Sequence, residues 1–314
     1  MQPLVSILIP CYNSEQWIGQ AIESALGQTW PNKQVIVLDD GSTDNSLNVI
    51  RRYESHLRWE SGQNRGGGYA RNRLLEMASG EWVQYLDADD YLLPDKVTQQ
   101  VDFVVQHPKV DVVIGPTTME FWSEEDVRRQ PIAIPEPHDY WTMLASWKLP
   151  QTGAPLWRKS AILEVGGWKL DQPCCQEHEL YLRLLIGGKK FAYHSSGGSI
   201  YRQWSDQTVC RRDISEVHRR RLEIERNLEE FLSRTGQLTP MRLRAISQAR
   251  FEMARIAWQY DRSFATRMME EVRKTDPDFS PTGEAAPSHY KLVFRACGFN
   301  FAEGLAAAAR GVFR

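Results

Sequence analysis

The sequence lacks long apolar runs and is poor in cysteine. A membrane-spanning helix needs about 20 consecutive apolar residues, and no stretch of the 314 residues approaches that length. The five cysteines are odd in number and show no CxxC spacing, so a zinc ribbon is excluded and reduced thiols are expected. The opening stretch MQPLVSILIPCYN has no basic leader and no cleavable small-residue site. We therefore expect a cytoplasmic protein.

A strong charge of either sign is also lacking. The 38 Lys and Arg residues and 40 Asp and Glu residues give a net charge of -2 at pH 7. No block of like charge marks a nucleic-acid-binding arm or an acidic tail. We therefore expect no nucleic-acid partner. The length allows one large α/β domain, or an ordinary domain with an appendage.

The first two thirds of the chain alternate short apolar runs with segments of helical period. The runs LVSILI, VIVL, WVQYL and VDVVI begin at residues 4, 35, 82 and 110. Apolar strands separated by helices are typical of a parallel sheet covered on both faces. The first helix is predicted to begin at about Ser14, a good N-cap, and to end at Gly27. We predict a doubly wound, mostly parallel α/β sheet over residues 1–205.

Residues 206–314 have a different pattern, with long helices rich in Arg and Glu. Spacings of i, i+4 predict the pairs Glu216–Arg220, Arg219–Glu223, Arg221–Glu225 and Glu230–Arg234. We interpret residues 219–221 as a solvated helix face rather than a basic docking patch. A following helix is predicted to carry on one side Leu243, Ile246, Met253, Ile256, Tyr260 and Phe264. The stretch 275–289, rich in Pro, Gly and Ser, is predicted to be a loop.

Ligands of an open doubly wound sheet bind at the carboxyl ends of its strands. Strand one is followed by PCYNSEQW, which lacks the GxGxxG of a dinucleotide site, so a nicotinamide dehydrogenase is disfavoured. Strand two ends in Asp39 and Asp40, followed by residues 42–44, which can cap the next helix. Capping does not require two carboxylates at the strand end. These carboxylates can accept hydrogen bonds from a nucleobase N–H or a ribose hydroxyl.

The stretch GEWVQYLDADDYLLPD ends an apolar run in three carboxylates. A calcium-binding EF-hand is excluded, because the sixth position counted from Asp87 is Leu92 and the twelfth is Thr98. A helix start explains Pro94 and Asp95 only. If the segment is extended, Asp87 and Asp89 point the same way and can present two oxygens to Mg²⁺ or Mn²⁺.

In order and spacing, the segments LVSILIPCYN, VLDDGSTD, NRGGGYARN and GEWVQYLDADD resemble the motifs of family-two inverting nucleotide-sugar glycosyltransferases. The resemblance covers residues 1 to about 205 and implies the GT-A fold. It implies that Asp39 or Asp40 contacts the base or ribose, and that Asp87 and Asp89 form the DxD metal and diphosphate site. Asp90 is a further candidate there. The implied nucleotide site consists of Pro10, Tyr12, Asn13, Asp39, Asp40, Arg71, Asp87 and Ala88.

In this family the general base opens a helix after a Gly-Gly-aromatic turn, here residues 166–168. The common form Glu-Asp-aromatic-Asp-Leu places Gln176 at the Glu, Glu177 at the Asp and Glu179 at the second Asp. Glu179 can pair with Arg183 at i, i+4, whereas Glu177 lies about 160° away around the helix. We therefore predict Glu177 as the base and His178 as its neighbour.

Two later segments carry further candidates. SIYRQWSDQT resembles the family's strand ending in Tyr-Arg, with Trp204 where His is common. Arg202 can contact the diphosphate or form a structural ion pair, and Trp204 can stack on a sugar or fill the core. The C-terminal stretch combines Lys291, Arg295, Arg310 and Arg314 with Phe294, Phe299, Phe301, Leu305 and Phe313. Such a helix can lie on an anionic membrane, as a peripheral contact, or pack on its own domain or a partner.

The expectation is a metal-dependent glycosyltransferase that moves a sugar from a UDP-linked donor to an acceptor hydroxyl with inversion. The acceptor would be a glycan or a lipid-linked molecule in surface polysaccharide or glycolipid synthesis. The alternative is a non-catalytic nucleotide-sugar-binding or scaffold protein with the same fold. A nucleotidyltransferase is a weaker third reading, because the glycine-rich basic loop expected after strand one is absent.

Overall fold

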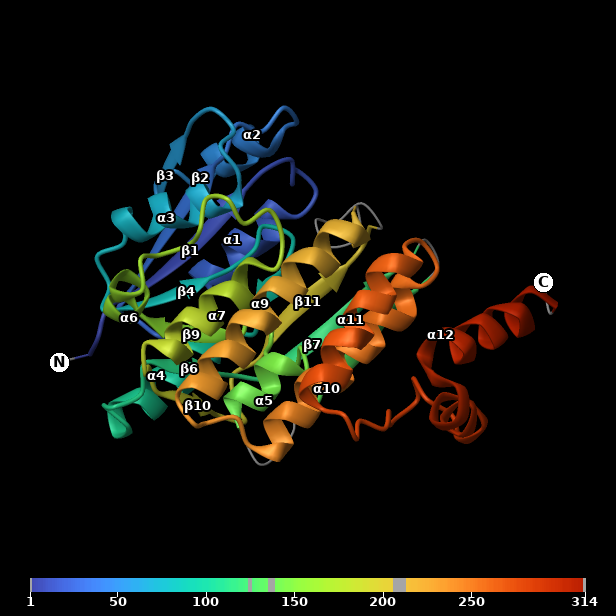
Figure 1. Cartoon of the computed structure of the whole chain (residues 1–314). Coiled ribbons are helices and arrows are strands. Elements are labelled where there is room, and N and C mark those ends of the chain that lie inside the picture. Colours follow the sequence, from blue (N-terminus) through green and yellow to red (C-terminus); the bar gives the residue numbers. More distant parts are fainter. Residues whose placement is uncertain (1, 124–125, 135–138, 206–212, 313–314) are drawn as a thin grey trace. The chain divides into compact units, whose positions relative to one another are not determined.

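The computed structural model describes residues 2–123, 126–134, 139–205 and 213–312. The chain divides into two compact units, whose helices and strands are labelled in Figure 1. Unit 1 comprises Met1–Tyr140 and Leu149–Arg212, and unit 2 comprises Trp141–Lys148 and Asp213–Arg314. The boundary predicted at residue 205 borders residues 206–212, which lie outside the described residues.

Unit 1 contains a seven-stranded sheet with the strand order β10-β6-β9-β4-β1-β2-β3. Its strands are β1 (Val5–Cys11), β2 (Lys33–Asp39), β3 (Arg58–Ser61), β4 (Trp82–Tyr85), β6 (Val112–Ile114), β9 (Pro155–Arg158) and β10 (Phe191–Tyr193). β9 runs antiparallel to β4 and β6, and the other neighbouring pairs are parallel. The predicted mostly parallel sheet is therefore confirmed, with one reversed strand that the sequence pattern did not indicate.

Both faces of this sheet are covered. Successive side chains of a strand point to opposite faces, yet every residue of β1 except Pro10 is buried. On one face, α1 (Ile18–Leu26) and α4 (Lys96–Gln106) share an apolar core with the odd-numbered residues of β1. The remaining helices of unit 1 are α2 (Ser46–Arg51), α3 (Gly67–Met77), α6 (Lys159–Glu164) and α7 (Gln176–Ile186). Burial of both faces explains why the strands are nearly continuous apolar runs.

Helix α1 begins later than predicted. A turn over residues 15–17 precedes it, closed by hydrogen bonds from the Trp17 and Ile18 N–H groups to the Ser14 carbonyl. The Ser14 hydroxyl donates to the Tyr12 carbonyl and does not cap the helix. The prediction of Ser14 as N-cap is therefore wrong, while the predicted end at Gly27 is confirmed.

Unit 1 also contains a four-stranded sheet with the order β5-β11-β7-β8. Its strands are β5 (Tyr91–Leu92), β7 (Thr117–Trp122), β8 (Val127–Ile132) and β11 (Ser199–Gln203). β11 is antiparallel to β5 and parallel to β7. Because β5 directly follows residues 87–90, this pairing brings the end of β11 beside the acidic stretch.

Unit 2 is helical, as predicted for the C-terminal part. Its helices are α9 (Ile214–Arg234), α10 (Pro240–Ala257), α11 (Arg262–Thr275) and α12 (Ser288–Val312). Most of α5 (Tyr140–Ala145) also belongs to unit 2. Residues 276–287 contain no helix or strand, which confirms the predicted loop.

The charged face of α9 differs in part from the prediction. Glu216 pairs with Arg220 and Arg221 pairs with Glu225, as predicted. Arg219 pairs with Glu216 instead of Glu223. Arg219 is exposed, but the Arg221 guanidinium lies 4.7 Å over the ring of Trp147. The solvated face therefore does not extend to Arg221.

The inner face predicted for the second C-terminal helix is only partly correct. Ile246 and Met253 of α10 are buried, whereas Ile256 and Tyr260 are exposed, and Phe264 belongs to α11. The buried side of α10 also contains Ala249, Arg250, Phe251, Ala254 and Ala257. Arg250 is tolerated inside because Glu229 lies 2.6 Å from its Nη1 and Glu225 lies 3.7 Å from its Nε.

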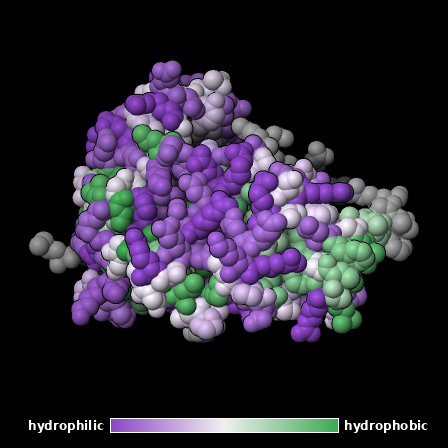
Figure 2. Space-filling model, in the orientation of Figure 1, coloured by the Kyte–Doolittle hydropathy of each residue, from purple (hydrophilic) through white to green (hydrophobic). Residues whose placement is uncertain are grey.

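Helix α12 is interrupted at Gly298, where φ is 79° and ψ is 179°. Phe294 and Phe299 are buried, so these two side chains cannot make the membrane contact considered for this stretch. Phe301 and Leu305 are exposed. Figure 2 shows an apolar surface over this part of the chain. Phe313 and Arg314 lie outside the described residues.

Two further findings concern membrane spans and thiols. Among the described helices, none combines the length and apolar character needed to cross a bilayer. Cys11 and Cys297 carry free thiols, and Cys210 lies outside the described residues.

Candidate active site

The carboxyl ends of β1, β2 and β4 lie at one edge of the sheet. Cys11 at the end of β1 pairs with Asp39 at the end of β2, and Leu8 pairs with Tyr85 at the end of β4. The segments that follow Pro10 and Asp39 are joined by Asn13. Its N–H donates to the Ser42 hydroxyl at 3.0 Å, and its Oδ1 accepts from the N–H of residue 43 at 2.8 Å. Tyr12 beside it is exposed.

The two acids at the end of β2 hold neighbouring loops. Asp39 Oδ1 accepts from the Ser42 N–H at 3.2 Å, and Oδ2 accepts from the Ser61 hydroxyl at 2.7 Å. The Asp40 carboxylate accepts from the N–H groups of residues 65 and 66 at 2.9 and 2.8 Å. Burial raises the pKa of Asp40 above its ordinary value, although these two hydrogen bonds oppose the rise. Contact of either acid with a nucleoside stays a prediction.

Arg71 of α3 joins the acidic stretch to α7. Its Nη2 lies 2.7 Å from Asp87 Oδ1, and its Nη1 donates to Gln176 Oε1 at 2.6 Å. The guanidinium also lies 5.1 Å over the ring of Trp168. One arginine side chain therefore spans the end of β4 and the helix start that carries Glu177.

The glycines of NRGGGYARN allow α3 to approach the turn at residues 166–169. A Cβ atom on Gly68 would stand 2.5 Å from the carbonyl oxygen of Lys169. Asn72 binds the same turn, because its Oδ1 accepts from the Trp168 N–H at 2.8 Å and its Nδ2 donates to the Trp168 carbonyl at 2.7 Å. This packing fixes the position of Arg71 relative to α7.

Residues 87–90 form a turn, not the extended segment that was predicted. The Asp90 N–H donates to the Asp87 carbonyl at 3.0 Å. The side chains of Asp87 and Asp89 are therefore not aligned by strand alternation. Asp87 bonds Arg71, whereas Asp89 Oδ2 accepts from the Trp204 indole N–H at 2.9 Å. Burial raises the pKa of Asp89, and the charge of Asp87 raises it further.

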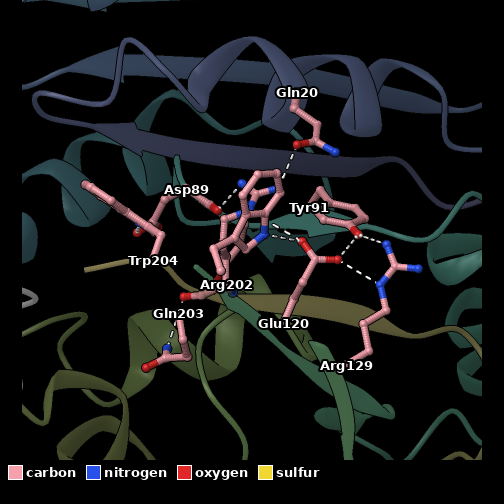
Figure 3. Close-up of polar contacts among 10 residues, drawn as sticks. Gln20, Asp89, Tyr91, Glu120, Arg129, Arg202, Gln203 and Trp204 are labelled. Atoms are coloured by element: carbon pink, nitrogen blue, oxygen red, sulfur yellow. Dashed lines mark hydrogen bonds and ion pairs between the residues drawn. The ribbon is translucent and has the colours of Figure 1, made fainter. Parts of the chain in front are cut away.

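Arg202 lies behind this turn and is only 1% exposed. Its Nη1 donates to the Asp89 carbonyl at 2.5 Å, and its Nη2 donates to Gln20 Oε1 at 2.6 Å (Figure 3). Its backbone N–H donates to Asp90 Oδ1 at 2.8 Å, and its guanidinium lies 4.1 Å over the ring of Trp17. Of the two roles predicted for Arg202, these contacts favour the structural one.

Glu120 of β7 completes the surroundings of Arg202 and was missed by sequence reasoning. Figure 3 shows its carboxylate between Arg202 and the pair formed by Tyr91 and Arg129. It accepts from Trp122 Nε1 at 2.7 Å, from the Tyr91 hydroxyl at 2.8 Å and from Arg129 Nε at 2.8 Å, and it lies 3.6 Å from Arg202 Nε. Burial raises the pKa of Glu120, but these hydrogen bonds outweigh burial and hold the pKa below its ordinary value. No spacing in the sequence marks these residues, because β5, β7 and β11 bring them together.

The two glutamates in the first turn of α7 differ in their partners. Glu179 is buried and binds Arg183 Nη2 at 2.6 Å and Lys169 Nζ at 2.8 Å, which confirms the predicted pair with Arg183. Glu177 is 23% exposed and forms no ion pair with Lys or Arg among the described residues; its Oε1 lies 3.8 Å from His178 Nδ1. Burial raises the pKa of Glu177, but the adjacent His178 outweighs burial and holds that pKa below its ordinary value. Glu177 is therefore ionised at neutral pH and chemically able to accept a proton.

The acidic turn offers few protein ligands to a cation. Within the described ranges, no three or more His, Cys, Asp or Glu side chains are grouped to hold a metal ion. Asp87 and Asp89 supply carboxylate oxygens, and the buried Oδ2 of Asp90 has no hydrogen-bond partner. Two carboxylates fit Mg²⁺ or Mn²⁺ when substrate phosphates complete the coordination.

Comparison with known proteins gives a family for the first half of the chain. Residues 6–161 match the model of glycosyl transferase family 2. TuaG of Bacillus subtilis, whose name assigns it to teichuronic acid biosynthesis, is 36% identical over 110 residues, which cover 33% of this chain and 43% of TuaG. The chain spans less than half the length of the curated relatives it matches. The predicted resemblance to family two is confirmed.

Solved structures are similar to this chain in fold over nearly its whole length. S. aureus TarS 1-349 in complex with UDP-GlcNAc has a TM-score of 0.63 at 16% identity, covering 98% of this chain and 91% of TarS. The mannosyltransferase PcManGT from Pyrobaculum calidifontis, in complex with GDP-Man and Mn²⁺, has a TM-score of 0.53 at 17% identity, covering 100% of this chain and 81% of PcManGT. At such identities the likeness shows the fold alone. The predicted GT-A fold is confirmed.

Proposed function

Since residues 6–161 match glycosyl transferase family 2 and the fold is GT-A, we propose that this protein transfers a sugar from a UDP-linked donor to an acceptor hydroxyl with inversion. The acceptor is a glycan or a lipid-linked molecule in surface polysaccharide or glycolipid synthesis. The name of TuaG supports this setting, and the UDP-GlcNAc complex of TarS supports the donor class.

The bridge formed by Arg71 carries this proposal. It holds the acidic turn after β4 and the start of α7 within reach of one guanidinium, at 2.7 Å from Asp87 and 2.6 Å from Gln176. A donor diphosphate at Asp87 would therefore stand near Glu177, the residue after Gln176. This is the arrangement that a single displacement needs, with a leaving group on one side and a base on the other.

The donor side is proposed to consist of the strand ends. Asp39 and Asp40, with Pro10, Tyr12 and Asn13 nearby, receive the nucleoside, and Asp87 and Ala88 contact the diphosphate. The positive charge of Arg71 faces the same diphosphate and stabilises it as it departs. Asp87 and Asp89 would hold Mg²⁺ or Mn²⁺, which would add positive charge near the leaving group.

The acceptor side is proposed to depend on Glu177. Its lowered pKa keeps the carboxylate ionised, so that it can take the proton of the acceptor hydroxyl during attack on the anomeric carbon. Glu179 cannot do so without leaving Arg183 and Lys169. His178 lies beside this carboxylate, with its Nδ1 3.8 Å from Glu177 Oε1.

Donor binding tests this proposal directly. Calorimetry of UDP and UDP-sugars with and without Mn²⁺ should show binding that the cation strengthens. In Asp87→Asn, Mn²⁺ should strengthen nucleotide binding less, because an amide is a poorer ligand for a hard cation. Asp102→Asn, a change of the same kind at an exposed position of α4, is the matched control. Binding of no nucleotide would overturn the proposal, and binding without turnover on any donor would favour the scaffold alternative.

We also propose that α12 brings the protein to an anionic membrane that holds a lipid-linked acceptor. Phe301 and Leu305 are spaced i, i+4 and exposed, and Glu303 between them is buried against Arg255. The full chain should sediment with phosphatidylglycerol vesicles and not with phosphatidylcholine vesicles. Phe301→Asp should abolish sedimentation, and Val105→Asp, at another exposed apolar side chain, should not. Equal behaviour of the two variants would contradict this role of α12.

A further inference from the structure

Two side chains at the end of β11 and just after it, Arg202 and Trp204, hydrogen-bond to Asp89. The Arg202 guanidinium binds the Asp89 carbonyl at 2.5 Å, and the Trp204 indole N–H binds its carboxylate Oδ2 at 2.9 Å (Figure 3). We propose that Trp204 is a positioning residue that orients the Asp89 carboxylate for a divalent cation. This inference rests on the proposed function, in which Asp89 is a ligand of that cation.

The Trp204 indole packs against an aromatic cluster on one side and hydrogen-bonds Asp89. Its ring centroid lies 5.7 Å from that of Trp17, which in turn lies 5.0 Å from that of Trp122. The Arg202 guanidinium stacks 4.1 Å over Trp17. Because Trp204 directly follows β11, which pairs with β5 just after the acidic turn, the sheet sets where the N–H points.

The chemistry of indole separates positioning from coordination. An indole N–H can only donate a hydrogen bond, so Trp204 cannot bind a cation itself and acts through Asp89. The other oxygen, Oδ1, accepts no side-chain hydrogen bond from the described residues and stays available to a ligand. Groups that hold a metal-binding side chain in this way set its orientation and basicity.

Trp122 offers a matched comparison. Trp122 and Trp204 are both 39% exposed, and both pack on Trp17. The Trp122 indole N–H donates to Glu120, which keeps Tyr91 and Arg129 as donors when Trp122 is changed. Replacing either tryptophan by Phe removes one indole N–H of the same kind, but only Trp204→Phe removes a donor to Asp89.

The test is Mn²⁺ binding, measured from the electron paramagnetic resonance signal of the free ion in the presence of UDP. Trp204→Phe should weaken Mn²⁺ binding by about 10- to 100-fold, the range typical of lost partners of metal ligands. Trp122→Phe should leave Mn²⁺ binding unchanged. UDP binding without metal should be the same in both variants, and thermal unfolding should show that both are folded.

The outcomes separate this inference from the proposed function. Unchanged Mn²⁺ binding in Trp204→Phe would overturn the positioning role, and so would an equal loss in Trp122→Phe, which would indicate a general effect of the aromatic cluster. An effect of Trp204→Phe on the acceptor KM alone would show that the ring contacts a sugar instead. Failure of the unmodified protein to bind Mn²⁺ would contradict the metal site of the proposed function itself.

Discussion

Replacement of Arg202 by Met tests whether the buried arginine holds the acidic turn. Met is of similar length, so the change removes mainly the charge and the hydrogen bonds to the Asp89 carbonyl and to Gln20. The buried Glu120 carboxylate, 3.6 Å from Arg202 Nε, then loses this neighbouring cation. Breaking a buried charged pair costs about 3–5 kcal/mol. We expect about 3 kcal/mol, the lower end, because Glu120 keeps its bonds from Arg129, Tyr91 and Trp122.

The assay is thermal unfolding followed by circular dichroism. For a unit of this length, 1 kcal/mol shifts the midpoint by about 2–4 °C, so Arg202→Met should lower Tm by about 6–12 °C. Arg129→Met is the control, because Arg129 binds the same Glu120 but is 62% exposed. The Arg129 end of this pair is open to solvent and Glu120 keeps its other donors, so the control should cost at most about 1 kcal/mol and shift Tm by less than about 4 °C. Equal Tm shifts in the two variants would refute the argument that Arg202 stabilises the fold because it is buried.

Three further predictions, each with its own substitutions, have defined outcomes. Glu179→Gln should lower Tm by several degrees because Arg183 and Lys169 lose their shared carboxylate, while Glu177→Gln should leave Tm unchanged; the reverse order in thermal unfolding would contradict the assigned environments. Burial lowers the pKa of His218 from 6.5 to about 4, and the charge of Arg221 adds to this effect. As pH falls from 6.5 to about 4, His218 takes up a proton in the unfolded chain but not in the folded one, so the free energy of unfolding should fall by up to about 3 kcal/mol. In urea unfolding, His218→Gln should remove this pH dependence. Gly298→Ala should lower stability by about 1–2 kcal/mol through its positive φ, and Arg273 Nη2 would lie 2.6 Å from the new Cβ. Gly304→Ala, in open space within the same helix, should instead raise stability by about 0.5–1 kcal/mol.

The sheet and its carboxyl edge could be read from the sequence because their signals are local. The apolar runs of β1, β2 and β4 show strand length directly, Asp39 is the last residue of β2, and Asp87 follows β4 after one residue. The pair formed by Glu179 and Arg183 was predictable for the same reason, since helix geometry alone brings them together.

Other features depend on contacts between distant segments. The turn at residues 87–90 was predicted as extended, because the sequence does not show that the Asp90 carboxylate receives the Arg202 N–H from β11. Arg250 lies in the core of unit 2 and departs from the apolar pattern expected for α10. It can be buried because Glu225 and Glu229 of another helix pair with its charge. Glu120, Tyr91 and Gln20 gave no signal at all, since only the pairing of β5, β7 and β11 collects them around Arg202.

The most direct test of the central claim is release of free nucleoside diphosphate from a panel of nucleotide sugars with Mn²⁺ and glycan acceptors. The unmodified protein, Glu177→Gln and Glu179→Gln would be compared below the unfolding temperature of all three. We predict turnover in the unmodified protein and in Glu179→Gln, and loss of turnover with retained donor binding in Glu177→Gln. Turnover that survives Glu177→Gln would contradict the role of Glu177 as base, and donor binding without turnover in the unmodified protein would contradict the transferase itself.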